Sequence, residues 1–313
     1  MTILIAIQGW KPEPWLERFR RLGTGRTIID AREPFDPAAI RFAAVWKPQP
    51  GLLGRLPNLK GIFNLGAGVD ALLADTTLPD RPIFRIVNPD LTKRMTEWVS
   101  LQVLYHMRQM PAYLAQQRER LWRPLPQPGA HEVRVGIMGM GVLGRDSAEV
   151  LMRLGFQVAG WSRSRQAIPG MDSFAGSDEL SAFLARTDIL VSLLPLTEDT
   201  RGILSRDLLA QLPQNGALGG PFLINAGRGG LQVEADILAA LDDGTLLGTS
   251  LDVFDPEPLA PTSPLWAHPR VVITPHVSAD STPDGLVAGV LADIAAFEAG
   301  KTLPNQIDRN TGY

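Results

Sequence analysis

Cysteine is absent from this chain of 313 residues. Its absence excludes disulfides, thiolate metal ligands and cysteine nucleophiles. The absence of cysteine is also consistent with a reducing compartment, where disulfides are rare. Lysine is scarce, and most of the 30 cationic residues are arginine. We attribute this preference for arginine to genomic composition rather than to function.

Blocks of basic charge and long apolar runs are also missing. The formal net charge is −3 at pH 7, a mildly acidic balance that disfavours a nucleic-acid partner. Without a run of about 18 apolar residues, no transmembrane helix is expected. The first residues lack the cationic and apolar regions of a signal peptide. The sequence therefore predicts a cytoplasmic protein with no membrane partner.

The composition is otherwise that of a globular protein, with 45% hydrophobic and 20% charged residues. A chain of this length typically forms about two domains and buries a large core. Apolar segments of strand length alternate with helix-like segments, which predicts α/β units with parallel sheets covered on both faces. The expected strands lie at 1–7, 27–30, 43–46, 60–65 and 83–87 in a first series and at 133–138, 156–161, 188–194, 221–225, 247–253 and 271–274 in a second.

A helical segment and a connector separate the two series. Apolar residues at helical spacing predict one long helix over 91–117, which Pro111 should end or kink. The proline- and glycine-rich stretch 122–129 is typical of an exposed connector. A last helix is expected at about 283–299. It has no evident partner in the second series, so we expect it to return to the first.

A glycine-rich loop follows the strand 133–138. Gly139, Gly141 and Gly144 form a G-x-G-x-x-G pattern, with a helical segment after it and a strand at βαβ distance. In this context the first glycine permits a tight turn, the second lets backbone approach a pyrophosphate, and the third lets helix pack on strand. The pattern predicts a dinucleotide site, the alternative being a glycine-rich turn without a ligand.

The next strand indicates which dinucleotide is bound. An NAD site usually has an acidic residue there that bonds the ribose 2′-hydroxyl. This chain has Ser162, Arg163, Ser164 and Arg165 instead. Arginine can hold a 2′-phosphate, which a carboxylate would repel. We therefore predict NADP(H) over NAD(H), the alternative being a solvated basic loop.

Three charged residues follow the ends of expected strands in the second series. They are Arg228, Glu257 and His276, and parallel strands bring such positions to one edge of a sheet, where α/β proteins bind ligands. The four histidines show no metal-ligand spacing, so no metal is expected. Taken singly, Arg228 could be a surface ion-pair residue and Glu257 part of a proline turn.

Several motifs in fixed order resemble the D-isomer-specific 2-hydroxyacid dehydrogenases. Within that family the chain is similar to the glyoxylate/hydroxypyruvate reductase A subgroup, and the resemblance covers nearly the whole sequence. The motifs are the glycine-rich loop, Leu193-Leu194-Pro195-Leu196-Thr197, Asn225-Ala226-Gly227-Arg228-Gly229, Leu251-Asp252-Val253-Phe254 with Glu257-Pro258-Leu259, Thr274-Pro275-His276, Val45-Trp46-Lys47-Pro48, Asn64-Leu65-Gly66-Ala67-Gly68-Val69-Asp70, Trp161-Ser162-Arg163-Ser164-Arg165 and Gly312-Tyr313.

The resemblance implies an α/β protein of two domains and a homodimer. A Rossmann-type doubly wound domain at 99–278 would bind NADP(H). A smaller flavodoxin-like substrate domain would be discontinuous, formed by 1–98 and 279–313. The residues implied in cofactor binding are Gly139, Met140, Gly141, Val142, Leu143, Gly144, Ser162, Arg163, Ser164, Arg165, Leu194, Pro195, Ala226, Gly227 and Asp252.

The resemblance also implies catalytic roles. His276 would be the general acid, Glu257 would orient its ring, and Arg228 would bind the substrate carboxylate. Asp252 would bond the nicotinamide carboxamide. Trp46 would limit substrate size, the alternative being a core tryptophan. The other carboxylate oxygen would meet the backbone N–H groups of Gly66, Ala67, Gly68 and Val69.

The expected reaction is NADPH-dependent reduction of glyoxylate to glycolate and of hydroxypyruvate to D-glycerate. One alternative is a reductase for a bulkier 2-oxo acid such as phenylpyruvate. Another is a nucleotide-dependent sensor or corepressor on the same fold. Two features depart from the family pattern: Gly227 replaces the usual alanine or serine, and the loop 216–221 is longer. Glycine at 227 is expected to loosen Arg228.

Overall fold

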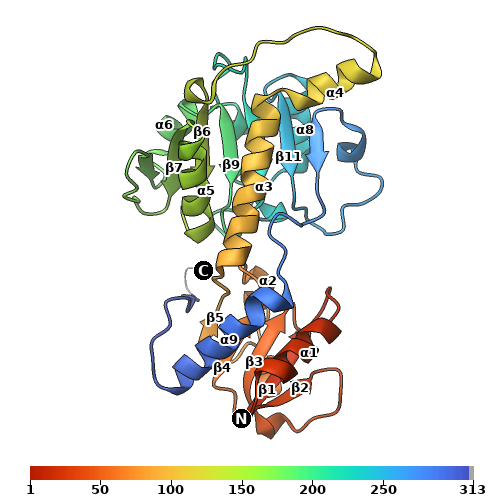
Figure 1. Ribbon diagram of the computed structural model, residues 1–313, viewed down its shortest axis with the longest axis vertical. Helices are drawn as coiled ribbons and strands as arrows, with labels where there is room; N and C mark the ends of the chain where they lie inside the picture. Colours follow the sequence, from red (N-terminus) through yellow and green to blue (C-terminus); the bar gives the residue numbers. More distant parts are fainter. Residues whose placement is uncertain (310–313) are drawn as a thin grey trace. The chain divides into compact units, whose positions relative to one another are not determined.

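The computed structural model describes residues 1–309 and divides them into two compact units (Figure 1). Unit 1 comprises Met1–Leu91 and the described chain from Ser281 onward, and unit 2 comprises Thr92–Asp280. The sequence predicts the boundaries between the two domains at 98/99 and 278/279. The first boundary lies earlier in the structure because Met95 and Trp98 already pack in a core cluster of unit 2. The motif Gly312-Tyr313 lies outside the described residues.

Unit 1 is built, within the described residues, on a parallel sheet of order β2-β1-β3-β4-β5. Adjacent residues of a strand face opposite sides of a sheet. Ile62 joins an aliphatic cluster on one face, while Phe63 stacks on Phe84 at 4.8 Å on the other. The strands are β1 (Thr2–Ile7), β2 (Thr27–Asp30), β3 (Ile40–Trp46), β4 (Gly61–Asn64) and β5 (Ile83–Phe84).

Helices α1 (Glu13–Leu22), α2 (Asp70–Leu73) and α9 (Pro283–Glu298) belong to the same unit. Phe297 of α9 meets Phe84 with ring centroids 5.2 Å apart. An ion pair between Arg18 and Asp284 joins α1 to α9, which lie side by side (Figure 1). The last helix therefore packs on the sheet of the first series.

Unit 2 contains a second parallel sheet, of order β12-β11-β10-β9-β6-β7-β8 among the described residues. The chain runs from β6 to β8 in one direction and from β9 to β12 in the other. The strand order therefore reverses between β6 and β9, and open α/β sheets bind ligands beyond the carboxyl ends of the strands at such a switch point. The strands are β6 (Arg134–Met138), β7 (Gln157–Ser162), β8 (Asp172–Ala175), β9 (Ile189–Ser192), β10 (Phe222–Asn225), β11 (Gly248–Leu251) and β12 (Val271–Ile273).

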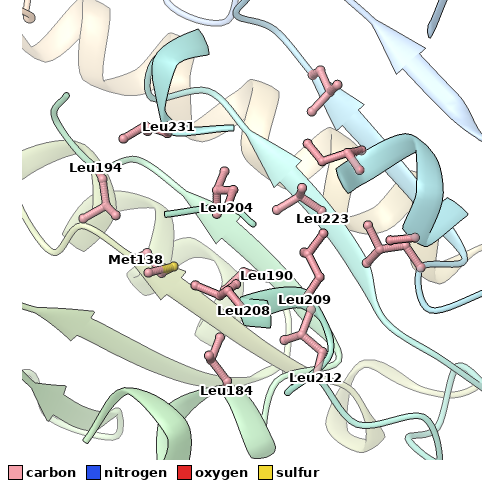
Figure 2. Close-up of a cluster of buried hydrophobic side chains, with 14 of the residues drawn as sticks. Met138, Leu184, Leu190, Leu194, Leu204, Leu208, Leu209, Leu212, Leu223 and Leu231 are labelled. Carbon is pink, nitrogen blue, oxygen red and sulfur yellow. The ribbon is translucent and has the colours of Figure 1, made fainter. Parts of the chain in front are cut away.

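Both faces of the second sheet are covered by helices. Ile189 and Val191 pack with side chains of α3 (Pro89–Met107) and α5 (Val142–Arg153). Leu190, between them, joins a leucine-rich cluster on the other face, formed with α6 (Leu180–Ala185), α7 (Arg206–Leu209) and α8 (Glu234–Asp242) (Figure 2). The predicted α/β class with parallel sheets is thereby confirmed.

The helix expected at 91–117 is two helices. α3 ends at Met107, and α4 runs from Met110 to Arg118. Gln109 adopts a left-handed conformation with φ of 54° between them. Pro111 occupies the first turn of α4, where its missing N–H costs no hydrogen bond. The proline therefore starts a helix instead of ending one.

His106 of α3 is fully buried in unit 2, in a chain of polar contacts. Its Nε2 lies 2.8 Å from Ser250 Oγ, and that hydroxyl donates to Gln102 Oε1 at 2.8 Å. The hydroxyl therefore accepts from Nε2–H of the ring. Nδ1 has no hydrogen-bond partner within residues 1–309. Burial lowers the pKa of His106 to about 4.

This burial predicts a pH-dependent stability. Below pH 6.5 the unfolded chain protonates His106, whereas the folded protein keeps it neutral down to about 4. The free energy of unfolding should therefore rise by about 3 kcal/mol from pH 4 to pH 6.5 and then level off. Urea unfolding of the wild type and of His106→Gln at several pH values measures this contribution. Parallel pH curves for the two proteins would contradict it.

Candidate functional site

The glycine-rich loop follows β6 at the point where the strand order of unit 2 reverses. Gly139 has φ of 102°, and a Cβ there would lie 2.7 Å from the backbone of Leu193. A Cβ on Gly144 would overlap the carbonyl oxygen of Gly139, whereas one on Gly141 would meet nothing within 4 Å. The first and third glycines thus allow close backbone packing. The second lies beside open space at the start of α5.

The start of α5 offers unpaired donors. Among the described residues, the N–H groups of Met140, Gly141 and Val142 have no protein acceptor. A helix start of this kind also carries a partial positive charge, because the backbone dipoles align. Together with the open space at Gly141, these donors fit a pyrophosphate.

The segment after β7 carries the two expected arginines. Ser162 Oγ donates to the carbonyl oxygen of Ser164 at 2.8 Å, which bends the chain. Arg165 donates to the carbonyl oxygen of Ser173 and forms an ion pair with Glu179. Arg165 is therefore anchored to β8 and the start of α6. Arg163 is exposed beside it.

The loops after β9 and β10 lie against each other beside the glycine-rich loop. Leu193 N donates to Met138 O at 2.8 Å, and Ala226 N donates to Ser192 O at 3.1 Å. Leu194, Pro195, Ala226 and Gly227 therefore lie at the carboxyl edge of the sheet, with Leu194, Ala226 and Gly227 buried. Leu143 lies in the first turn of α5.

His276 and Glu257 are in direct contact. Nδ1 of His276 lies 3.0 and 2.9 Å from the two carboxylate oxygens of Glu257. Oε1 of Glu257 also accepts from Phe254 N at 3.2 Å, which fixes the carboxylate. This contact holds the imidazole through one nitrogen and leaves Nε2 for a reacting group. The side chain of His276 is 35% exposed, so a small molecule can reach it.

Asp252 holds the turn that carries His276. Its fully buried carboxylate accepts from Thr274 Oγ1 at 2.5 Å, Val277 N at 2.9 Å and Ser278 N at 3.0 Å. Its carbonyl oxygen accepts from His276 N at 2.7 Å. His276 itself has φ of 55°. These bonds give Asp252 a positioning role that the sequence did not predict, while its expected contact with the carboxamide stays a prediction.

Arg228 follows β10 in a loop that Asn225 fixes. Asn225 accepts from Gly227 N at 3.1 Å and donates to Arg228 O at 3.1 Å. Arg228 Nη1 donates to Gly227 O at 2.7 Å. A Cβ at position 227 would lie 2.7 Å from Leu194 O. Glycine here allows a close contact with Leu194, and the expectation of a loosened Arg228 stays a prediction.

The loop 216–221, which the sequence predicts to be longer than in the family, lies between α7 and β10. Gly219 N donates to Gly216 O at 2.9 Å, which closes a turn. A Cβ on Gly216 would overlap the carboxylate of the buried Asp188, so glycine is needed there. Asp188 in turn pairs with Arg134 at 2.6 Å. This loop packs on the amino ends of the strands, away from the carboxyl edge that carries Arg228.

In unit 1 the expected anion-binding loop follows β4. Asn64 is buried, and its Nδ2 donates to Gly66 O at 2.8 Å and to Gly68 O at 2.9 Å. These carbonyls are thus turned inward. Within residues 1–309, the N–H groups of Gly66, Ala67, Gly68 and Val69 have no protein acceptor. Successive unpaired N–H groups at a strand end are suited to binding an anion.

Trp46 ends β3 beside this loop. A Cβ on Gly66 would lie 2.8 Å from Cε3 of the Trp46 ring and would overlap Cζ3. The indole therefore packs directly on the Gly66 backbone. Trp46 is half-buried. It is therefore not a fully buried core tryptophan, which was the alternative expected from the sequence.

Sequence reasoning missed the residues that hold these loops. Asn64 and Asn225 each end a buried strand and bond the backbone two to four residues later. Asparagine at the end of an apolar strand, followed by glycine-rich sequence, was the available signal. Thr274 Oγ1 donates a hydrogen bond to Asp252, and no local pattern in the sequence indicates this contact.

Residues 1–309 contain no group of three or more histidine or acidic side chains arranged to hold a metal ion. No helix in this part of the chain has the length and apolar character needed to cross a membrane.

Comparison with known proteins identifies relatives. A protein-family model described as "D-isomer specific 2-hydroxyacid dehydrogenase, NAD binding domain" matches residues 101–278. The chain is 48% identical to an NADPH-dependent glyoxylate/hydroxypyruvate reductase from Sinorhizobium meliloti, solved with NADP and sulfate. That match covers 100% of this chain and 99% of the other, with a TM-score of 0.95.

Two further solved structures match over the same extent. A probable 2-hydroxyacid dehydrogenase from Rhizobium etli, in complex with NADP, HEPES and L(+)-tartaric acid, is 45% identical with a TM-score of 0.95. A D-isomer specific 2-hydroxyacid dehydrogenase from Xanthobacter autotrophicus, in complex with NADPH and MES, is 38% identical with a TM-score of 0.94. Each match covers 100% of this chain and 99% of the other.

Proposed function

Because the chain belongs to the D-isomer specific 2-hydroxyacid dehydrogenase family, we propose that it is an NADPH-dependent reductase of small 2-oxo acids. The proposed reactions are glyoxylate to glycolate and hydroxypyruvate to D-glycerate. The observation that carries the proposal is the His276–Glu257 contact at 2.9 Å, on the sheet edge that also carries the glycine-rich loop. A 48% identical relative is named for this activity.

Residues of unit 2 fit a dinucleotide. The unpaired N–H groups at Met140, Gly141 and Val142 would hold the pyrophosphate. Arg163 and Arg165 would hold the 2′-phosphate. Leu194, Pro195, Ala226 and Gly227 lie at the same carboxyl edge of the sheet, and Asp252 would bond the carboxamide. When bound, NADPH supplies the hydride for the reduction.

The chain's own residues would supply the remaining chemistry. His276 gives a proton from Nε2 to the substrate carbonyl oxygen as negative charge develops there. Glu257 keeps the ring oriented by holding Nδ1. Arg228 binds the substrate carboxylate and polarises the carbonyl. The N–H groups of Gly66–Val69 bind a carboxylate oxygen.

The assay that tests this function follows the absorbance of the reduced nicotinamide with purified protein. Glyoxylate, hydroxypyruvate and phenylpyruvate are compared, each with NADPH and with NADH. Rapid oxidation of NADPH with the two small acids is expected. Faster turnover of phenylpyruvate would favour the bulkier-substrate alternative. Binding of NADPH without turnover of any 2-oxo acid would favour the sensor alternative.

The NADPH preference predicts a selective effect of the two arginines. Replacing both Arg163 and Arg165 with alanine should raise the KM for NADPH by about 100-fold, because two charge-assisted contacts to the 2′-phosphate are lost. The KM for NADH should change by less than about threefold, because NADH lacks that phosphate. Steady-state kinetics with both cofactors measure the ratio.

The matched control is Arg153→Ala, which removes an exposed arginine of α5 whose ion-pair partner within residues 1–309 is Glu149. It should leave both KM values unchanged. Equal losses for NADPH and NADH in the Arg163/Arg165 double variant would contradict the NADP assignment.

We also propose a homodimer. Apolar side chains are exposed along α3, α4 and the segment after them, which is unusual for a surface that meets only water. They are Leu101 at 58%, Met110 at 37%, Leu114 at 37%, Leu121 at 44% and Trp122 at 98% exposure. The cytoplasmic location stays a prediction from the sequence.

A further inference from the structure

Three tryptophans of unit 1 form a continuous stack. The rings of Trp10 and Trp15 lie 5.4 Å apart at 9°, and those of Trp10 and Trp46 lie 4.4 Å apart at 10°. Trp15 is 3% exposed on α1, so the inner end of the stack is anchored. Trp46, at the outer end, rests on Gly66.

The chain turns sharply to place Trp10 between the other two. Gln8 N, just after β1, donates to Trp46 O at 2.9 Å, which extends the pairing of β1 with β3. Gly9 then adopts φ of 80°, a conformation that glycine reaches without strain. The indole of Trp10 is thereby set parallel to the Trp46 ring.

The location of the stack is also informative. In the sheet order β2-β1-β3-β4-β5, the chain leaves β1 in one direction and returns to β3 on the other side. Ligands of open α/β sheets bind where the strand order reverses, beyond the carboxyl ends of the strands. Trp10 and Trp46 follow the carboxyl ends of those two strands. They therefore lie where this rule places a ligand of unit 1.

Backbone bonds hold both ends of the Gly66–Val69 loop, because Ile86 N donates to Gly66 O at 3.4 Å and Val69 O accepts from Leu73 N at 2.9 Å. Asn64 holds two of its carbonyl oxygens, at Gly66 and Gly68. Its N–H groups have no protein acceptor within residues 1–309. At the Gly66 end of the loop the Trp46 ring packs directly on the backbone, and it is the aromatic side chain that restrains the peptide carrying the first of these donors.

We propose that Trp10 is a positioning residue for substrate binding. It holds the Trp46 ring on Gly66 and so keeps the N–H groups of Gly66–Val69 aligned for the substrate carboxylate. This inference rests on the proposed function, which assigns a carboxylate to that loop. A stacked aromatic pair contributes up to about tenfold in an equilibrium constant, which sets the expected size of the effect.

The test compares Trp10→Ala with Trp10→Phe. The alanine variant should raise the KM for glyoxylate by about fivefold to tenfold, leave kcat within about twofold and leave the KM for NADPH unchanged. The phenylalanine variant retains a stacking ring and should recover most of the loss. Near-UV circular dichroism should show the coupled indole signal in the wild type and its loss in both variants.

The matched control is Trp266→Ala, which removes a 53% exposed tryptophan of unit 2. It should change none of these values. A Trp10→Ala protein that has lost the indole signal yet keeps the wild-type KM for glyoxylate would overturn the proposal. An equal rise in the KM for NADPH would do the same, since it would indicate general destabilisation.

Binding of oxamate, an unreactive mimic of a small 2-oxo acid, separates this inference from the proposed function. Calorimetry should give a Kd for oxamate about fivefold to tenfold higher in Trp10→Ala than in the wild type. That result stands even if no 2-oxo acid is turned over, in which case only the reductase assignment fails. If the wild type is an active reductase and the two proteins bind oxamate equally well, the role of Trp10 is refuted and the proposed function stands. Should Trp10→Ala not fold, Trp10→Phe decides, with an expected rise of about twofold in Kd.

Discussion

Replacing His276 with alanine is expected to lower kcat for glyoxylate by about 10²–10⁴-fold, the usual contribution of a general acid. The imidazole, held by Glu257 through Nδ1, is the proposed donor of the proton to the carbonyl oxygen. The affinity for NADPH should stay unchanged, because the glycine-rich loop is untouched. Steady-state kinetics and the fluorescence of bound NADPH measure the two quantities separately.

His131→Ala is the matched control for this variant, since His131 is exposed and belongs to the same unit. It should behave like the wild type. If the His276 variant kept its full turnover, the proton would have to come from another group, and the role proposed for His276 would be wrong.

Replacing Arg228 with alanine is expected to lower kcat/KM by about 10³-fold, equivalent to about 4 kcal/mol. The loss combines weaker binding of the substrate carboxylate with weaker polarisation of the carbonyl, so both kcat and KM should change. The loop itself should persist, because Asn225 holds it through backbone atoms. Kinetics over a range of glyoxylate concentrations give both parameters.

Arg228→Lys tests the geometry of the contact. Lysine keeps the charge but cannot form two parallel hydrogen bonds to a carboxylate, so it should restore only part of the loss. Arg206→Ala removes an exposed arginine of α7 and should have no effect. An Arg228→Ala enzyme with wild-type kcat/KM would exclude Arg228 from substrate binding.

Most strands could be predicted because parallel strands buried on both faces are continuous apolar runs. β8 was missed, since Asp172–Ala175 lies at the sheet edge and has no fully buried residue to give such a signal. The break between α3 and α4 was also missed. Both halves are helical by local preference, and a left-handed Gln109 leaves no pattern in the sequence.

The candidate site was predictable where motifs mark it. Glu257 follows β11 and His276 follows β12. These two strands are neighbours in the sheet, which agrees with the contact between the two side chains. The ion pair of Arg165 with Glu179 and the bonds of Asp252 to the turn at 274–278 were not predictable. They depend on contacts between segments whose spacing in the sequence carries no periodicity.

The bonds of Asp252 bear on how much the enzyme must reorganise during a turnover. Because a buried carboxylate already fixes the backbone on both sides of His276, the ring does not have to be ordered when substrate arrives. The loss of conformational entropy occurs when the chain folds and is not repeated in each catalytic cycle. With His276 as the proposed general acid, substitutions that loosen β11 or β12 are expected to reduce activity before they unfold the protein.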